Sequence, residues 1–329
     1  MPTASVIIPT YNGQQTIGPA VHSVLTQNFD DYEILIGDDC STDQTPQILD
    51  YLEKSHTHIT AYYWDHNLGI AKNMNKLVKR STGDILLFLD QDDYWLSSKI
   101  EKHVNEHRRS NSSVVYSNYI IVDKNGEELD RTIPPEANSS GTLLVNQLYE
   151  QGNFIGTFSA VSVSRYTWET NNGLDERLDV SADYDFWVRL AGSEKFSHIN
   201  EELASKRKHE RNHSDKYRQI HKDNKLILEK SLDLYPHLRG KEKTIRSQQI
   251  YHHSNAAFRD GNTQEAINQA IYSLQYKLHI KTIIILLLSI IDFITFSNDL
   301  GTKIYYNIYK NTEAQTLLKS IRSSVGWRN

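Results

Sequence analysis

The sequence predicts an α/β fold in which helices cover both faces of a mostly parallel sheet. Over the first half of the chain, short apolar runs alternate with amphipathic segments, as in strand–helix–strand units. One apolar run, 86–89, leads directly into three carboxylates, Asp90, Asp92 and Asp93. In an open α/β sheet, ligands gather beyond the carboxyl ends of the strands. These acids therefore predict a bound metal ion with an anionic ligand.

Each expected strand is a short apolar run, and each expected helix has apolar residues at helical spacing on one face. The strands are expected at 6–8, 33–36, 59–64, 84–89 and, before a turn at 123–126, from residue 114. The helices are expected at 15–27, from 45 through 52, at 70–81 and at 97–109. Thr45 and Pro46 support the second helix, because threonine caps helix N-termini and proline favours the first helical position.

The composition limits the domain organisation and the class of protein. A chain of 329 residues accommodates one domain of about 210 residues and an appendage, and we place the division at 1–215 and 216–329. The net charge of −5 argues against a nucleic-acid partner that is bound through bulk electrostatics. The lone Cys40 excludes an intramolecular disulfide, and strand-like sequence follows Met1 without a signal peptide. We therefore expect a cytoplasmic protein.

A series of short motifs runs through the first 215 residues. They are 5–13 (SVIIPTYNG), 37–43 (GDDCSTD), 67–73 (NLGIAKN), 89–95 (LDQDDYW), 182–190 (ADYDFWVRL) and 206–209 (KRKH). In this order they resemble the motifs of the family 2 glycosyltransferases, which have the GT-A fold and invert the stereochemistry of the transferred sugar. The resemblance implies a GT-A domain over roughly these residues. Past Asp215 the composition changes to a stretch rich in Lys, Gln, Leu and Tyr, from which we expect an α-helical C-terminal extension.

Glycosyl transfer from a nucleoside diphosphate requires a stabilised leaving diphosphate. A hard divalent cation such as Mn²⁺ or Mg²⁺ prefers carboxylate oxygens and neutralises the charge that develops on the phosphates. We expect Asp92 to bind this metal directly, with Asp90 directed towards the ribose and metal-bound water. The resemblance places His209 near the metal or the leaving group, and neutral histidine is a competent metal ligand.

The resemblance also assigns residues to the donor nucleotide. They are Pro9, Thr10, Tyr11, Asp39, Lys72, Asp90 and Arg207. Thr10 offers a hydroxyl and Tyr11 an aromatic face, and Asp39 can accept a hydrogen bond from a base imide. Lys72 and Arg207 offer positive charge to the diphosphate.

The catalytic base is expected in the acidic stretch that enters a helix at 182–190. Phe186 and Trp187 can fix this helix to the core, and a rigidly held carboxylate suits proton abstraction. By resemblance, Asp183 takes the proton from the acceptor hydroxyl. Residue 182 is alanine where the family often has glutamate, so Asp185 is the reserve candidate.

Structural alternatives exist for most of these assignments. Aspartates after a strand or before a helix often cap the helix N-terminus. The segment 10–13 alone is typical of a turn, and Lys72 alone is typical of a solvated helix lysine. The basic run 206–214 alone is also typical of an exposed loop, or of a loop that touches anionic lipid.

Two further regions complete the chain. Long loops between 131 and 158 are expected to contact the acceptor, with 153–157 lining the site. Around 258–270, the sequence resembles the turn of a helical hairpin. The apolar segment 282–296 is shorter than the ~20 residues of a spanning helix, which leaves a packed helix, a homo-oligomer interface or a peripheral membrane anchor.

The sequence therefore predicts an inverting, metal-dependent glycosyltransferase. It would move a sugar from a UDP-sugar or dTDP-rhamnose donor to a glycan or lipid-linked acceptor, at the inner face of the cell membrane, in surface-polysaccharide synthesis. A sugar nucleotidyltransferase is the first alternative, but it usually has a glycine-rich basic loop where 9–15 here is PTYNGQQ. A non-catalytic glycan-binding scaffold is the second. It would not need Asp92, Asp183 and His209 together.

Overall fold

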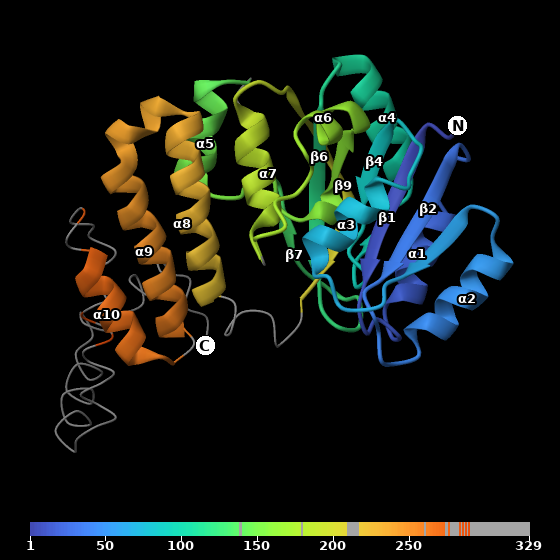
Figure 1. The fold of residues 1–329 in the computed structure, drawn as a ribbon, viewed down its shortest axis with the longest axis horizontal. Helices are drawn as coiled ribbons and strands as arrows, with labels where there is room; N and C mark the ends of the chain where they lie inside the picture. The colour runs from blue at the N-terminus through green and yellow to red at the C-terminus, as the bar shows by residue number, and fades with distance from the viewer. Residues whose placement is uncertain are drawn as a thin grey trace. The chain divides into compact units, whose positions relative to one another are not determined.

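The chain forms two compact units, Met1–His209 and Glu210–Asn329. In this computed structural model, the described residues are 1–137, 140–178, 180–208, 217–259, 261–273 and 276, with four single positions between 283 and 289. Figure 1 follows both units by colour from the N-terminus.

The first unit is built on one sheet, which has nine strands in the described part of the chain. The strands are β1 (Ala4–Thr10), β2 (Tyr32–Asp38), β3 (Ile59–Tyr63), β4 (Ile85–Phe88), β5 (Tyr94–Trp95), β6 (Val114–Val122), β7 (Glu128–Thr132), β8 (Val161–Ser164) and β9 (Phe196–Arg207). Their order is β3-β2-β1-β4-β8-β6-β9-β5, and β7 pairs with β6. The five strands expected from the sequence are confirmed.

The pairing is parallel only in the first part of the sheet. Strands β3, β2, β1 and β4 are parallel neighbours. Strand β8 lies antiparallel between β4 and β6, and β9 is parallel to β6. The α/β fold class is confirmed, and the sheet is mixed rather than mostly parallel. Strand β8 has only four residues, too few to show a periodicity in the sequence.

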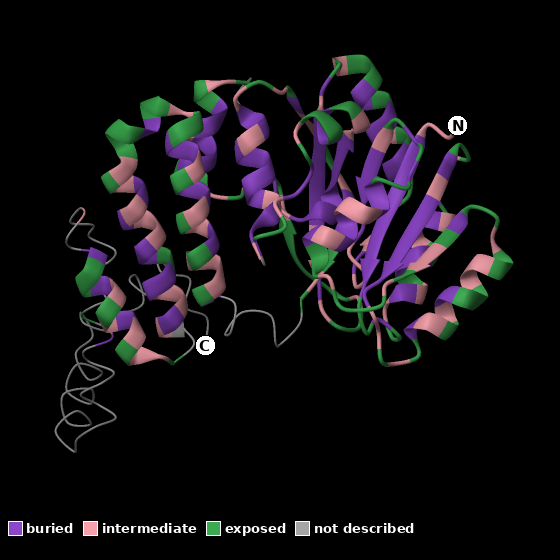
Figure 2. Cartoon of the chain, in the orientation of Figure 1, coloured by how far each residue is buried: buried purple, intermediate pink, exposed green. Residues whose placement is uncertain are grey.

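The helices of this unit cover both faces of the sheet. They are α1 (Ile17–Leu25), α2 (Thr45–Ser55), α3 (Ile70–Val78), α4 (Lys99–Ser110), α5 (Thr142–Gln151), α6 (Arg165–Thr170) and α7 (Ala182–Ala191), with a 3-10 turn η1 (Phe158–Ala160). Apolar residues of α1, α2 and α4 share one core with alternate residues of β1 and β2. On the other face, Phe88 stacks on Trp168 with ring centroids 5.0 Å apart, and the Trp168 and Phe186 ring centroids are 4.9 Å apart. Figure 2 shows the buried strands between these layers.

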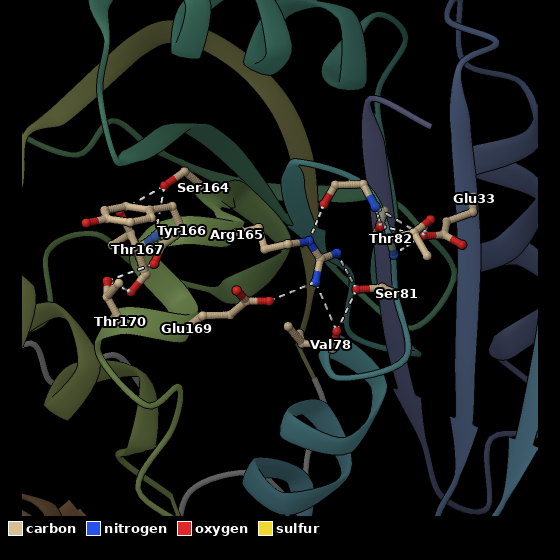
Figure 3. Close-up of polar contacts among 12 residues, drawn as sticks. Glu33, Val78, Ser81, Thr82, Ser164, Arg165, Tyr166, Thr167, Glu169 and Thr170 are labelled. Carbon is tan, nitrogen blue, oxygen red and sulfur yellow. Dashed lines mark hydrogen bonds and ion pairs between the residues drawn. The ribbon is translucent and has the colours of Figure 1, made fainter. Parts of the chain in front are cut away.

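Polar contacts fix the start of β4 (Figure 3). Arg165 donates from Nε to Gly83 O at 2.7 Å and from Nη2 to Ser81 Oγ at 2.8 Å. Glu33 Oε1 accepts from the backbone and side chain of Thr82. Because the starting point of β4 is fixed, the place where this strand ends and its acids emerge is fixed as well.

The second unit is helical in its described part. Its elements are α8 (Tyr217–Leu234), the 3-10 turn η2 (Pro236–Lys241), α9 (Glu242–Arg259) and α10 (Thr263–Ser273). Helices α9 and α10 form the expected hairpin, in which Ser254 Oγ donates to Ala266 O at 2.8 Å. The segment 282–296 lies almost wholly outside the described residues. No described helix is both long and apolar enough to span a membrane.

Candidate active site

The candidate site lies where β1, β2 and β4 end. Strand β1 pairs with β4 only as far as Ile7 opposite Phe88, and the two strands then part. Pro9 follows this point and lies opposite Gly37 of β2. Proline has no N–H to donate and is tolerated where a ladder ends. The strands therefore separate at the expected donor residues and leave their loops to form the site.

Gln91 joins the loops that follow β1 and β4. Its Oε1 accepts from Tyr11 N at 2.9 Å and from Thr10 Oγ1, and its Nε2 donates to Tyr11 O at 3.1 Å. The Tyr11 side chain is 45% exposed, so its ring is accessible to a ligand. Our sequence reasoning did not single out Gln91. The sequence feature that accompanies this contact is the glycine at position 13, because a Cβ there would lie 2.4 Å from Gln91 Oε1.

Asp39 brings the N-terminus of α3 to the end of β1. Its buried carboxylate accepts from Leu68 N at 2.7 Å and Gly69 N at 2.9 Å, and its own N–H donates to Thr10 O at 2.8 Å. Each carboxylate oxygen can accept a further hydrogen bond. Lys72 lies in the first turn of α3 and makes no ion pair or side-chain hydrogen bond within the described residues.

The acids after β4 are held by the segment around η1. Thr157 Oγ1 donates to Asp90 Oδ2 at 3.2 Å, and Asp90 N donates to Ser159 Oγ at 3.1 Å. Ser159 Oγ in turn donates to Asp93 Oδ2 at 2.6 Å. Asp93 is 4% exposed, so it supports the loop from inside the protein. Ser159 is a second residue that our sequence reasoning missed.

The carboxylates of this loop act on one another. Burial raises the pKa of Asp90 to about 6, and the nearby carboxylate of Asp92 adds to this rise. Burial also raises the pKa of Asp93 well above its usual value, with further contributions from Asp90 and Asp92. A cation at this position would relieve the repulsion.

Asp183 lies in the first turn of α7. Its Oδ1 accepts from Tyr184 N at 2.7 Å, and its Oδ2 accepts from Asn153 Nδ2 at 2.8 Å. Burial raises the pKa of Asp183 to about 6. The reserve candidate Asp185 is buried and accepts from Arg189 Nε at 2.8 Å. Its ion pair makes Asp185 the poorer candidate for the base.

Arg207 contacts both a side chain and the backbone of the acidic loop. Its N–H donates to Asp93 Oδ1 at 2.8 Å, and its Nε donates to Asp92 O at 2.9 Å. Nη1 donates to Lys124 O at 2.7 Å, while Nη2 has no hydrogen-bond partner within the described residues. Arg207 therefore fixes the loop and keeps one nitrogen available for a ligand.

Lys206 is the neighbouring residue of β9, and its side chain is exposed. Its ammonium lies close enough to lower the pKa of both Asp90 and Asp183, opposing the effect of burial. The site thus combines the end of β4, the start of α7 and the end of β9. His209, the other expected residue of this basic run, lies outside the described residues.

Residues 5–167 match the sequence profile described as glycosyl transferase family 2. This part of the chain belongs to that family. Among its relatives is TuaG of Bacillus subtilis (strain 168), a glycosyltransferase provisionally assigned to teichuronic acid biosynthesis. It is 36% identical over 148 residues, 45% of this chain and 59% of TuaG. The WfgD protein of Escherichia coli is 32% identical over 142 residues, 43% of this chain and 55% of WfgD. The matches thus span little more than half of these relatives.

The family 2 domain also resembles a solved structure. Residues 1–349 of S. aureus TarS superpose with a TM-score of 0.61 and 21% identity, covering 82% of this chain and 79% of that one. TarS has also been solved in complex with UDP and with UDP-GlcNAc. At this identity the likeness concerns the fold alone, and it confirms the expected GT-A type of fold.

The donor set of the family 2 domain suits Mg²⁺ or Mn²⁺. Among the described residues, no three His, Cys, Asp or Glu side chains are grouped so that they could hold a metal ion by themselves. Mg²⁺ usually binds through one or two carboxylates plus substrate phosphates, which needs no larger group. Asp92 and Asp90 offer such hard oxygen ligands, and the negative charge of Asp92 adds to the rise that burial causes in the pKa of Asp90. These residues therefore fit a metal that is shared with a nucleotide.

Proposed function

We propose that this chain is an inverting, metal-dependent glycosyltransferase. It moves a sugar from a nucleoside-diphosphate donor to a glycan or lipid-linked acceptor during synthesis of a cell-surface polysaccharide. The observation that carries the proposal is the proximity of Asp90 and Asp183. The ammonium of Lys206 lowers the pKa of both carboxylates. Two side chains of the segment 153–157 donate hydrogen bonds, one to each carboxylate.

Asp183 is the catalytic base in this proposal. With a pKa of about 6, its carboxylate is mostly ionised at pH 7 and is still basic enough to accept a proton. The acceptor hydroxyl loses its proton to Asp183 as its oxygen bonds to the anomeric carbon. The bond from that carbon to the diphosphate oxygen breaks with its electron pair. Attack from the face opposite the diphosphate inverts the stereochemistry.

The other residues bind the donor and stabilise its leaving group. Thr10, Tyr11 and Asp39 contact the base and ribose next to the buried Pro9. Lys206 and the Nη2 of Arg207 face the diphosphate, together with Lys72 at the start of α3. A divalent cation on Asp92, with His209 as a second ligand, would supply further positive charge to the departing diphosphate.

The relatives support a particular class of donor and acceptor. The name of WfgD describes UDP-Glc as its donor and a diphosphoundecaprenol-linked sugar as its acceptor. TarS structures contain UDP and UDP-GlcNAc. We therefore place UDP-sugars first and dTDP-rhamnose second. A lipid-linked acceptor would bring the protein to the cytoplasmic face of the membrane.

Donor hydrolysis with water as the acceptor tests this function. The protein is incubated with Mn²⁺ and UDP-glucose, UDP-GlcNAc or dTDP-rhamnose. Proton NMR identifies which anomer of the free sugar appears first. An α-linked UDP-sugar should yield the β-anomer first, and Asp183→Asn should stop the release. Release of the α-anomer would contradict inversion. Formation of UTP from UDP-glucose and pyrophosphate would instead identify a nucleotidyltransferase.

A further inference from the structure

A short segment between α5 and η1 contacts both carboxylates of the proposed reaction. At its start, Asn153 Nδ2 donates to Asp183 Oδ2 at 2.8 Å. At its end, Thr157 Oγ1 donates to Asp90 Oδ2 at 3.2 Å. Only three residues separate these two donors, whereas the carboxylates that they hold are far apart in the sequence.

The conformation of this segment depends on glycine. Gly152 has φ of 77° and Gly156 has φ of 92°, values that other residues rarely adopt. A Cβ on Gly156 would lie 2.7 Å from Cε1 of Tyr119, whose ring is 8% exposed. The segment thus packs closely on β6 and has little freedom to shift.

The end of the segment is also fixed in the core. Trp95 Nε1 donates to Ser159 O at 2.9 Å, and Trp95 is 3% exposed. Ser159 N donates to Thr157 Oγ1 at 3.4 Å, which orients the hydroxyl that contacts Asp90. Asn153, by contrast, is exposed at the site, and its Oδ1 has no hydrogen-bond partner within the described residues.

We propose that Asn153 and Thr157 are positioning residues, and that their shared segment holds the proton-accepting oxygen of Asp183 at a set distance from the donor side of the site. This proposal rests on the function given above and deepens it. Small misplacements of reacting groups are costly, up to about 100-fold for 1 Å. A base carried by α7 and a donor carried by the ends of β1, β2 and β4 therefore need a common support.

The first test compares Asn153→Ala with Gln151→Ala, an exposed residue at the end of α5. For UDP-sugar hydrolysis, Asn153→Ala should lower kcat roughly 10- to 100-fold and leave the donor KM nearly unchanged. The acidic limb of its pH profile should move to higher pH, because the lost hydrogen bond favoured the charged carboxylate. Gln151→Ala should behave as the parent. An unshifted acidic limb in Asn153→Ala overturns the proposal.

The second test concerns Thr157, which is 4% exposed. Thr157→Val keeps the shape of the side chain and removes its hydroxyl, whereas Thr157→Ser keeps the hydroxyl. We expect Thr157→Val to lower kcat roughly tenfold and Thr157→Ser to restore it. In Asn153→Ala/Thr157→Val the two losses should be less than additive, because both variants release one segment. Full additivity, or equal loss in both Thr157 variants, contradicts a shared support.

A third measurement needs no enzymatic activity. Carbon-13 NMR of the aspartate carboxyl groups follows the titration of Asp183 in the ligand-free protein, with Asp183→Asn identifying its signal. In Asn153→Ala the pKa of Asp183 should rise above its value in the parent. If the parent transfers no sugar but this shift occurs, the proposed function fails and the contact stands. If sugar transfer occurs without the shift, the positioning role fails.

Discussion

The side-chain amide of Gln91 forms a pair of hydrogen bonds with the backbone of Tyr11, at 2.9 Å and 3.1 Å. Through this pair, the loop of acids after β4 is joined to the loop after β1. Gln91, which lies between Asp90 and Asp92 in the sequence, thus sets how close the base-binding and phosphate-binding parts of the site lie. The pair also explains Gly13, since a Cβ there would meet Gln91 Oε1 and Thr10 Oγ1.

We expect Gly13→Ala to weaken nucleoside-diphosphate binding about tenfold, since displacing Gln91 leaves polar groups unpaired at a cost of about 1–3 kcal/mol. Gln91→Ala should weaken binding similarly, and Gly13→Ala/Gln91→Ala should cost less than the sum because the shortest contact of the new Cβ, the one with Gln91, is gone. Gly18→Ala is the matched control, as a Cβ there meets nothing within 4 Å. Calorimetric titration of the four proteins gives the affinities. Additive losses would contradict the proposed collision.

The raised pKa of Asp183 predicts the pH dependence of the reaction. A base must be deprotonated to act, so kcat should rise with pH through about 6 and then level off. Asp183→Asn should lower kcat by about 10²- to 10⁴-fold, the usual size of a general-base contribution. Initial rates of donor hydrolysis between pH 5 and pH 8 check both expectations, at an Mn²⁺ concentration that remains saturating. Asp185→Asn serves as comparison, and its profile should keep the same inflection.

Asp90 should reduce the stability of the protein without metal. Its pKa in the folded state, about 6, lies above the ordinary value of 3.8. The folded state therefore holds this proton more tightly, and that contribution to stability is lost as pH rises through about 6. We expect Asp90→Asn to raise the free energy of unfolding by about 3 kcal/mol at pH 7.5 and by little at pH 4. Urea unfolding in EDTA measures it, and an equal gain at both pH values would exclude this origin.

A buried chain of hydrogen bonds runs from α4 to β8. Lys99 Nζ lies 2.9 Å from His103 Nε2, and His103 Nδ1 lies 2.8 Å from Ser162 Oγ. His107 Nε2 lies 2.8 Å from the same hydroxyl, and its Nδ1 lies 2.7 Å from Ser112 O. A carbonyl oxygen only accepts, so His107 Nδ1 carries the hydrogen and His107 Nε2 accepts from the hydroxyl of Ser162. That hydroxyl in turn accepts from His103 Nδ1, and His103 Nε2 accepts from Lys99. Burial lowers the pKa of His103 well below its usual value and that of His107 to about 4, so both imidazoles are neutral at pH 7 and Lys99 is the donor at the start.

This arrangement predicts a pH-dependent effect of Lys99. Burial lowers the pKa of Lys99 well below 10.5, so the unfolded chain holds the extra proton and stability from this group rises with pH. Lys99→Met removes this dependence of stability on pH, whose slope approaches about 1.4 kcal/mol per pH unit. The difference in the free energy of unfolding, variant minus parent, should therefore be larger at pH 7.5 than at pH 9.5. Urea unfolding at both pH values checks this, with the exposed Lys79→Met as a control that shows no such difference.

Much of the fold followed from local patterns. Strands β1 to β4 and helices α1 to α4 lie where apolar runs and helical spacing predicted them. Residues Phe186 and Trp187 hold α7 in the core as expected. Strand β8, with four residues, and β5, with two, are too short to show a period and depend on pairing with distant strands. The antiparallel part of the sheet was missed for this reason.

The site was predicted in its acids and less well in its supports. Asp90, Asp92 and Asp183 stood out because carboxylates at a strand end or a helix start form local patterns. Gln91 and Ser159 act through contacts that join loops far apart in the chain, and local patterns in a single sequence do not contain that information. The assignments of residues to donor, metal and base remain predictions.

The most direct test of a metal-dependent donor site is calorimetric titration of UDP, dTDP, GDP and CDP, each with Mn²⁺ and with EDTA, on the parent and on Asp92→Ala. We expect one of these nucleotides to bind the parent only with Mn²⁺, and Asp92→Ala to lose this binding while the same change at the exposed Asp30, Asp30→Ala, keeps it. Binding of none of the four, or binding that is indifferent to both metal and substitution, would contradict a metal-dependent donor site at the end of β4.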